Sequence, residues 1–210
     1  MNREKINKQP PRVFSVLGCS VFFGCSVFSV RATLPAIAIV AAITLLGGCK
    51  ILFHEFLVAR MTAQQYKDQC IFVTRDDFKK TTSVETQLFN FYFKSNSYEG
   101  YRLYSVKKDN GNVVYGLDLY TSYGRGWAFW NNAADQNGNE FSMKQLKTIR
   151  SESGKTEEWA SAQLSREYLE SIRKTGITWR FYGRSITAQA TILPQIVDGF
   201  LMRVDETFKE

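Results

Sequence analysis

YRLYSVKKDNGNVVYGLDLY, residues 101–120, contains two stretches of alternating apolar and polar side chains on either side of a turn. The alternation in residues 101–106 and 113–120 is typical of half-buried β-strands. The intervening turn, residues 109–112, contains the Asn-Gly pair that favours a tight hairpin. We therefore expect an antiparallel strand pair here and a sheet that extends from it in both directions.

Further strand patterns lie on both sides of this hairpin. The predicted strands cover residues 84–93, 127–130, 141–149, 157–163 and 177–182, and a second Asn-Gly turn is expected at residues 135–139. Upstream, residues 51–69 are apolar and then polar, which indicates a helix that leads into the sheet.

Two helices are predicted in the C-terminal third of the chain. The first begins after Ser165, a good N-cap, and ends at Gly176, which suits the left-handed position after a helix. The second has Pro194 in its first turn and apolar residues at helical spacing from Leu193 to Val204. The predicted fold class is α+β: a mainly antiparallel sheet of five to seven strands with two packed helices, preceded by an apolar N-terminal segment.

The apolar N-terminal segment ends at a cysteine. Residues 34–48 read LPAIAIVAAITLLGG, an uncharged run between Arg31 and Lys50 that Cys49 closes. A cation, a short apolar stretch and small residues before a cleavage site are the three parts of a secretory signal. We therefore expect residues 1–49 to be a signal or membrane anchor, residues 50–69 a tether or short helix, and residues 70–210 a single exported domain.

The last four residues of this run resemble the lipobox of bacterial lipoproteins. They are Leu46, Gly47, Gly48 and Cys49. The resemblance implies that the Cys49 sulfur takes a diacylglycerol, that a signal peptidase recognises the three residues before it, and that the new N-terminus is acylated. It also implies that Lys50, directly after the cysteine, favours the outer membrane. The domain behind it loosely resembles uncharacterised exported bacterial domains, and that likeness implies no activity.

A second uncharged run, residues 13–30, departs from the lipoprotein pattern, which needs only one such run. Translation that starts at Val27 or Val30 would remove it. A helical hairpin of residues 13–30 and 34–59 would also use both runs, but it would place Lys50 in the bilayer at a high cost. A single uncleaved transmembrane helix is the main alternative to acylation. Acylation of Cys49 and an uncleaved transmembrane helix would both hold the domain at a membrane.

Charge and cysteine content narrow the function classes. The net charge of the chain is +7, but little of it lies in the domain. From Lys50 onward the chain has 22 basic and 19 acidic residues, and they form no clustered basic stripe. Nucleic-acid binding is therefore not expected. Cys70 is the only cysteine beyond Cys49, so we expect no intramolecular disulfide in the domain and interpret Cys70 as a small buried apolar residue.

Catalytic constellations are scarce. His54 is the only histidine, so triads and zinc sites are not expected, and we predict no cofactor, no metal and no enzyme activity. The oxygen-bearing residues 135–140 weakly resemble the start of a calcium loop, but a hairpin turn is the favoured interpretation. Asp76, Asp77 and Glu85 are the candidates for a carboxylate pair of a sugar hydrolase.

One aromatic segment indicates a contact surface. Its aromatic residues are Tyr120, Tyr123, Trp127, Phe129 and Trp130, with Arg125 between them. Tyr123, Arg125, Trp127 and Trp130 form the candidate binding surface for a glycan or peptide, against the alternative that they are core. Strand alternation would place Trp127 and Phe129 on the face opposite Trp130.

The sequence as a whole predicts a membrane-anchored envelope protein. We expect a non-enzymatic binding or scaffold module in the periplasm or at the cell exterior, held by a lipid or a helix, with a protein or glycan partner. The alternative is an inner-membrane protein with one or two uncleaved helices that acts as an accessory subunit of an envelope complex.

Overall fold

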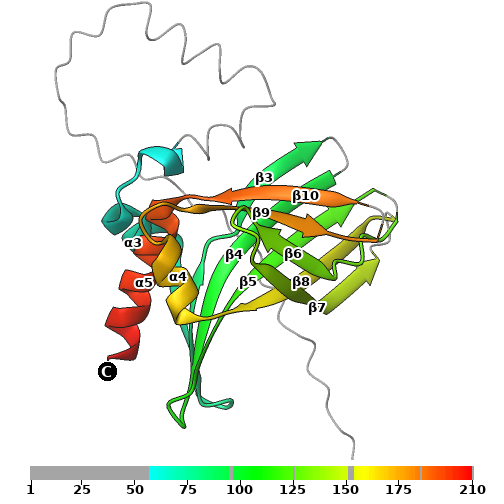
Figure 1. The fold of residues 1–210 in the computed structure, drawn as a ribbon. Helices are drawn as coiled ribbons and strands as arrows, with labels where there is room; N and C mark the ends of the chain where they lie inside the picture. Colours follow the sequence, from blue (N-terminus) through cyan, green and yellow to red (C-terminus); the bar gives the residue numbers. More distant parts are fainter. Residues whose placement is uncertain (1–56, 95–96, 125, 151–153, 185, 210) are drawn as a thin grey trace, which may run out of the picture. The chain divides into compact units, whose positions relative to one another are not determined.

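The structure is a computed structural model, and it describes residues 57–94, 97–124, 126–150, 154–184 and 186–209 (Figure 1). Residues 46–49, which resemble a lipobox, and both uncharged runs lie outside these residues, so the anchor stays a prediction. Among the helices of the described residues, none combines the length and the apolar character that crossing a bilayer requires.

An antiparallel sheet dominates the described residues. Its strands are β1 (Ile71–Asp76), β2 (Thr81–Thr86), β3 (Phe89–Lys94), β4 (Ser97–Lys108), β5 (Val113–Tyr123), β6 (Asn132–Asp135), β7 (Glu140–Arg150), β8 (Thr156–Leu164), β9 (Ile177–Tyr182) and β10 (Thr187–Ile192). Hydrogen bonds join them in the order β1-β2-β4-β5-β8-β7-β6-β9-β10. β2 and β3 pair with successive halves of β4, on the edge opposite β5.

The hairpin predicted at residues 101–120 is confirmed as the β4–β5 pair. Tyr101 lies opposite Leu119, and Leu103 opposite Leu117. Gly111 in the connecting turn has a φ of 81°, a conformation that glycine adopts without steric cost. The residues opposite one another at these positions are fully buried, so this pair lies at the centre of the core.

The sheet curls until strands that are distant in the pairing order touch. The Tyr101 hydroxyl in β4 donates to the Thr191 carbonyl oxygen in β10, 3.1 Å away. The ring of Phe91 in β3 stacks on that of Phe181 in β9, with centroids 6.3 Å apart. The concave face encloses the core, as the approach of β3 to β9 and β10 in Figure 1 shows.

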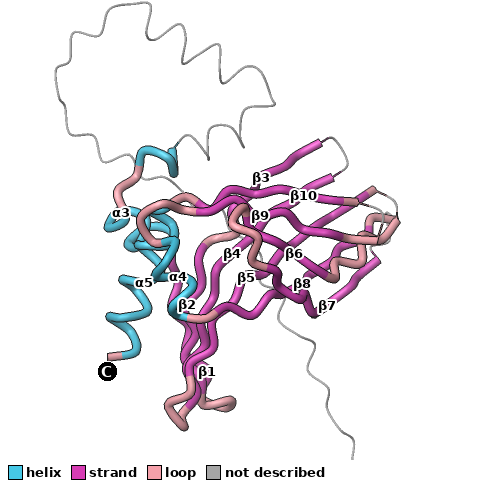
Figure 2. Tube along the Cα trace, viewed as in Figure 1, coloured by secondary structure: helices cyan, strands magenta, loops and turns pink. Residues whose placement is uncertain are grey.

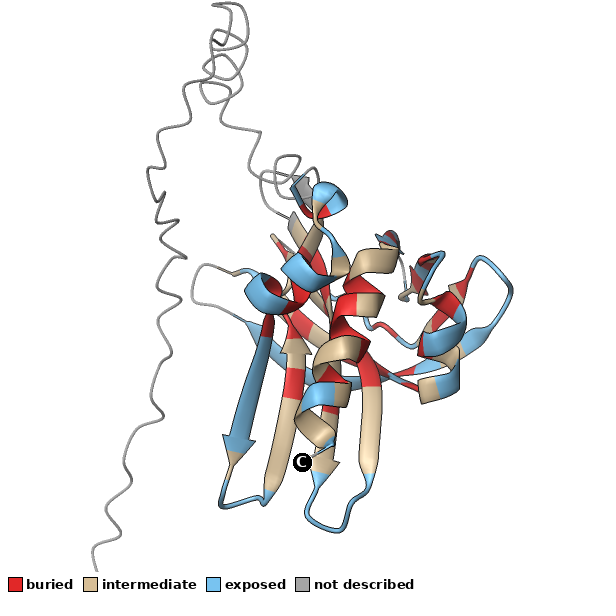
Figure 3. Ribbon diagram, turned by 90° about the vertical axis from the view of Figure 1, so that its left-hand side faces the viewer, coloured by how far each residue is buried: buried red, intermediate tan, exposed pale blue. Residues whose placement is uncertain are grey.

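Three helices gather against one part of the sheet (Figure 2). They are α3 (Ala63–Cys70), α4 (Arg166–Ile172) and α5 (Pro194–Phe208). α5 packs on α3, α4, β1, β2 and β4. Its buried positions follow one face of the helix that ends at the C-terminus in Figure 3, which confirms the predicted apolar stripe.

The predicted helix boundaries are partly right. Ser165 is the N-cap of α4, because its hydroxyl accepts from the Tyr168 amide at 3.0 Å. α4 ends at Ile172 rather than at Gly176, but Gly176 has the expected left-handed conformation, with a φ of 65°. The helix expected over residues 51–69 is interrupted within the described residues. Thr62 starts α3 with a capping box, and α3 packs on α5 as part of the folded domain.

The numbers of strands and helices predicted from the sequence were too low. The described residues contain ten strands rather than five to seven, and the three helices α3, α4 and α5 rather than two. β1 was missed because most of its side chains are exposed and show no alternation. β10 was missed because its buried residues include the small Ala188 and Ala190. The strand expected at residues 84–93 divides into β2 and β3. The pairing of β2 with β4 ends at Glu85, opposite Tyr104, and β3 begins its own pairing with β4 at Phe89, opposite Tyr101.

Candidate functional site

The predicted strand at residues 127–130 is wrong: these residues form a loop between β5 and β6. Phe129 has a φ of 50°, in the left-handed region that a β-strand does not use. Bulky L-residues adopt this conformation at a cost of about 1–2 kcal/mol, so the surrounding structure must hold Phe129 in place.

A buried carboxylate supplies that restraint. Glu158 in β8 is fully buried, and its two oxygens accept hydrogen bonds from consecutive loop amides. The Ala128 amide donates to Oε1 at 2.6 Å and the Phe129 amide to Oε2 at 2.9 Å. Hydrogen bonds to a charged acceptor are about twice as strong as neutral ones. Glu158 therefore replaces the ladder partner that a strand would have provided.

The loop is also held from the β9–β10 side. The Arg184 amide donates to the Ala128 carbonyl oxygen at 2.7 Å, and a Cβ placed on Gly183 would lie only 2.5 Å from that oxygen. The Trp130 indole nitrogen donates to the Thr121 hydroxyl oxygen at 3.1 Å. These contacts hold the loop at Ala128 and Trp130, so its geometry is preorganised.

Two aromatic side chains project from this fixed loop. Trp127 is 36% exposed and Phe129 is 47% exposed, and their ring centroids lie 6.0 Å apart at an interplanar angle of 30°. We call Trp127 and Phe129 the aromatic pair. Large apolar side chains that are both exposed and rigidly held present contact area without a large entropy cost of ordering.

The candidate binding surface needs correction. Tyr123 and Trp130 are 8% and 2% exposed and belong to the core rather than to an open surface, while Arg125 lies outside the described residues. The expected separation of Trp127 and Phe129 from Trp130 holds, although the cause is the loop and not strand alternation. Tyr120 packs on Trp159 at a centroid distance of 4.7 Å.

Glu158 is the important residue that sequence reasoning missed. The sequence did contain a signal for this residue. Glu158 lies two and four positions before Ala160 and Ala162 in β8, so its side chain points to the same core-facing side of the strand. Glu99 in β4 similarly shares the parity of Tyr101 and Leu103. An acidic residue among inward-facing apolar positions marks a specific polar contact in the core.

The turn interpretation of residues 135–139 is confirmed. The Asp135 carboxylate accepts from the amides of Asn137 and Asn139, each at 2.9 Å, from the Asn139 side chain at 2.8 Å and from the Tyr168 hydroxyl at 3.0 Å. Burial acts to raise the pKa of Asp135, but the hydrogen bonds from Asn139 and its neighbours outweigh it and lower the pKa. Across the residues that the structure describes, no cluster of three metal-ligating side chains occurs.

The carboxylates considered for hydrolysis are engaged separately. Asp76 accepts the amides of Phe78 and Lys79 in the β1–β2 turn. Asp77 pairs with Arg75, and Glu85 pairs with Arg102. The structure does not bring Asp76, Asp77 and Glu85 together around one space.

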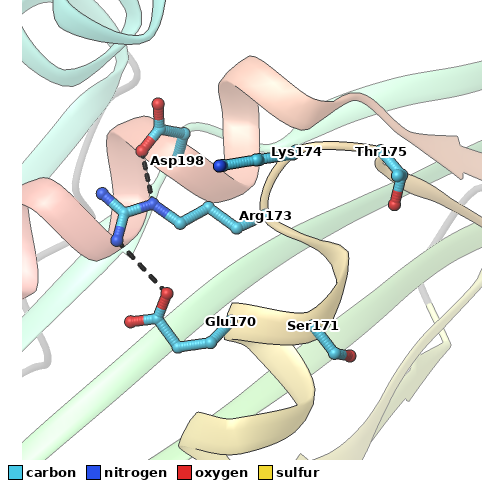
Figure 4. A pocket seen from close by; sticks show the side chains of 6 residues that line it. All are labelled: Glu170, Ser171, Arg173, Lys174, Thr175 and Asp198. Carbon is cyan, nitrogen blue, oxygen red and sulfur yellow. Dashed lines mark hydrogen bonds and ion pairs between the residues drawn. The ribbon is translucent and has the colours of Figure 1, made fainter.

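A groove between α4 and α5 holds a network of ion pairs instead of a reactive group (Figure 4). The Arg173 guanidinium lies between two carboxylates, with Nε 2.6 Å from Asp198 and Nη1 3.2 Å from Glu170. The nearby Asp198 raises the pKa of Arg173 further. These mutually paired charges tie the two helices together, and Lys174 lines the same groove without an ion pair to a described residue.

Comparison of the chain with protein family models and with curated proteins finds no match. The function must therefore be argued from the site itself. In the described residues, the aromatic pair on its Glu158-anchored loop is suited to non-covalent contact with an apolar surface or the face of a sugar ring.

Proposed function

We propose that this chain is a membrane-anchored envelope protein whose domain is a non-enzymatic binding module, and that the aromatic pair contacts a protein or glycan partner. The observation that carries this proposal is the left-handed Phe129, whose amide and that of Ala128 both donate to the buried Glu158 while the Phe129 ring stays exposed. Strain of this kind persists where the surrounding structure over-determines it, and it gathers at functional sites.

The anchor part of the proposal rests on the residues 34–49 and on the short distance to the domain. Seven residues lie between Cys49 and Leu57, the first described residue, so eight Cα–Cα steps join the two. Fully extended, they span at most about 28 Å. An acylated Cys49 would therefore keep the domain, and any partner bound to it, close to the bilayer surface in the periplasm or at the cell exterior.

Intact mass tests the anchor. The full chain is expressed in a diderm bacterium, extracted from membranes with detergent and weighed by mass spectrometry. Acylated Cys49 at a new N-terminus is expected, and Cys49→Ala should give an uncleaved chain without lipid. A mass that retains Met1 and no acyl group would overturn the lipoprotein assignment and leave the binding role of the domain untouched.

Substitution of the aromatic pair tests the binding role. The full chain in detergent is screened on a glycan array and by crosslinking in intact envelopes. Trp127→Ala and Phe129→Ala are expected to remove the captured partner and to lower stability by about 1–3 kcal/mol, because both side chains are half or more buried, and circular dichroism checks that each variant is folded. Leu146→Ala in β7 is the matched control, since Leu146 is 53% exposed at a different place. Unchanged capture by both aromatic variants would refute the proposed surface.

The second candidate is an inner-membrane accessory subunit with uncleaved helices. The uncharged run of residues 13–30 favours it, because a lipoprotein signal has no use for a second run. The same mass measurement distinguishes it through an intact N-terminus, and protease accessibility of the residues before position 13 from the cytoplasmic side would support it.

A further inference from the structure

A cavity opens where the curled sheet brings β3, β4 and β5 close to β10. Its volume is about 330 Å³, and its lining residues are Phe91, Glu99, Tyr123, Ile186, Thr187, Ala188 and Gln189. Thr187 and Gln189 are exposed and mark the solvent side, whereas Glu99 and Tyr123 are buried at the inner end. This volume lies at the lower limit of small-molecule pockets, so it suits a compact ligand.

The inner end of this cavity is a polar layer in a mainly apolar sheet face. Glu99 in β4 and Glu158 in β8 both lie opposite Thr121 in β5, on the inward face. Glu158 is engaged by the two loop amides described above. Glu99 is only 5% exposed, and its single hydrogen bond to a described residue is the one that its Oε1 accepts from the Tyr123 hydroxyl at 2.8 Å.

Glu99 therefore has acceptor capacity that faces the cavity. Burial raises the pKa of Glu99. Burial also raises the pKa of Tyr123, and the nearby carboxylates of Glu99 and Glu158 raise it further. Within the described parts of the chain, no Lys or Arg forms an ion pair with Glu99. A buried carboxylate without a counter-charge is costly, and a cation in the cavity would remove that cost.

We propose that this cavity binds a small organic cation, an ammonium group on a compact apolar body. The ammonium donates to Glu99 at the inner end, beside the Tyr123 hydroxyl. The apolar body lies against Phe91, whose ring is held by Phe181 and by Tyr101, at centroid distances of 6.3 and 6.1 Å. The proposal is independent of the aromatic pair and of the anchor.

Isosteric probes test the charge requirement. The full chain in detergent is titrated with phenethylammonium, with neutral 2-phenylethanol and with anionic 3-phenylpropionate, and binding is followed by calorimetry and by ligand-observed NMR. Phenethylammonium is expected to bind at least about tenfold more tightly than either the neutral or the anionic probe, because only the ammonium brings a positive charge to the Glu99 carboxylate.

Conservative variants locate the bound probe. Glu99→Gln keeps the side-chain volume and removes the charge, and it should weaken phenethylammonium binding about tenfold or more while leaving 2-phenylethanol nearly unchanged. Tyr123→Phe should produce a smaller loss, and Glu140→Gln, at an exposed position, should produce none. Circular dichroism checks that each variant is folded.

Three results would overturn the proposal. The first is no saturable binding of phenethylammonium to the wild-type chain at millimolar concentration. The second is equal affinity for all three probes. The third is binding that Glu99→Gln and Tyr123→Phe leave unchanged. If Glu99→Gln fails to fold, Tyr123→Phe and the comparison of the three probes on the wild-type chain still decide the outcome.

Discussion

Replacing Glu158 with Gln tests how the aromatic loop is held. In the wild-type chain both carboxylate oxygens accept loop amides, at 2.6 and 2.9 Å. Gln keeps one acceptor and places an NH₂ group against the other amide, so one hydrogen bond to a charged group is lost, worth about 1.5–3 kcal/mol. The amide left without its partner costs about 1–3 kcal/mol more.

The strain at Phe129 limits this loss. Once the clamp is weakened, the loop can relax, and the left-handed conformation of Phe129 returns about 1–2 kcal/mol. We therefore expect Glu158→Gln to lower the free energy of unfolding by about 2–4 kcal/mol. Glu157→Gln is the matched control on the same strand, because Glu157 is on the opposite face and is partly exposed. It should change stability by about 0.5 kcal/mol or less.

The assay is urea unfolding of the full chain in detergent, followed by tryptophan fluorescence, together with amide hydrogen exchange. In Glu158→Gln the amides of Ala128 and Phe129 should lose protection first, since they lose their acceptor. If Glu158→Gln and Glu157→Gln unfold at the same urea concentration and the two amides keep their protection, the clamp does not hold the loop and the reasoning is refuted.

Three other predictions follow from the core and the turns. Trp130→Ala should cost about 3–5 kcal/mol in chemical unfolding, because Trp130 is buried and bonded; a cost below about 1 kcal/mol would contradict its place in the core. Gly176→Ala should cost at least about 2 kcal/mol more than Gly138→Ala. Both glycines have positive φ, but a Cβ at Gly176 would lie 2.4 Å from a carbonyl oxygen, and one at Gly138 would meet nothing within 4 Å. Asp135, whose pKa is lowered, stabilises the fold above its unfolded pKa of about 4. The stability difference from Asp135→Asn should therefore shrink as the pH falls below about 4, and a difference independent of pH would argue against this.

Sequence reasoning succeeded where the controlling contacts are local. The hairpin at residues 101–120, the cap at Ser165 and the left-handed Gly176 each depend on residues within a few positions. The stripe of α5 was also readable, because helical periodicity records which face is buried. The edge strand β1 was missed because most of its side chains are exposed, and β10 was missed because two of its three buried positions hold only alanine.

The candidate site shows the opposite case. Aromatic residues at positions 127–130 favour a strand by propensity, yet Glu158, about thirty positions later, supplies the acceptors that make a loop. No local pattern in residues 127–130 records that partner. The sequence analysis placed Trp127 and Trp130 on opposite faces by strand alternation. In the structure, the loop conformation is what separates the exposed Trp127 from the buried Trp130.

By itself, the sequence determined the mainly antiparallel sheet with packed helices and the turn chemistry at its hairpins, because each is encoded by neighbouring residues; the anchor that ends at Cys49 stays a prediction. Tertiary structure alone decided the curl that carries Tyr101 to Thr191, the clamp of Glu158 on Phe129 and the cavity beside Glu99. Those features arise from side chains that meet only after the sheet has closed on itself, and burial then makes their few polar contacts specific.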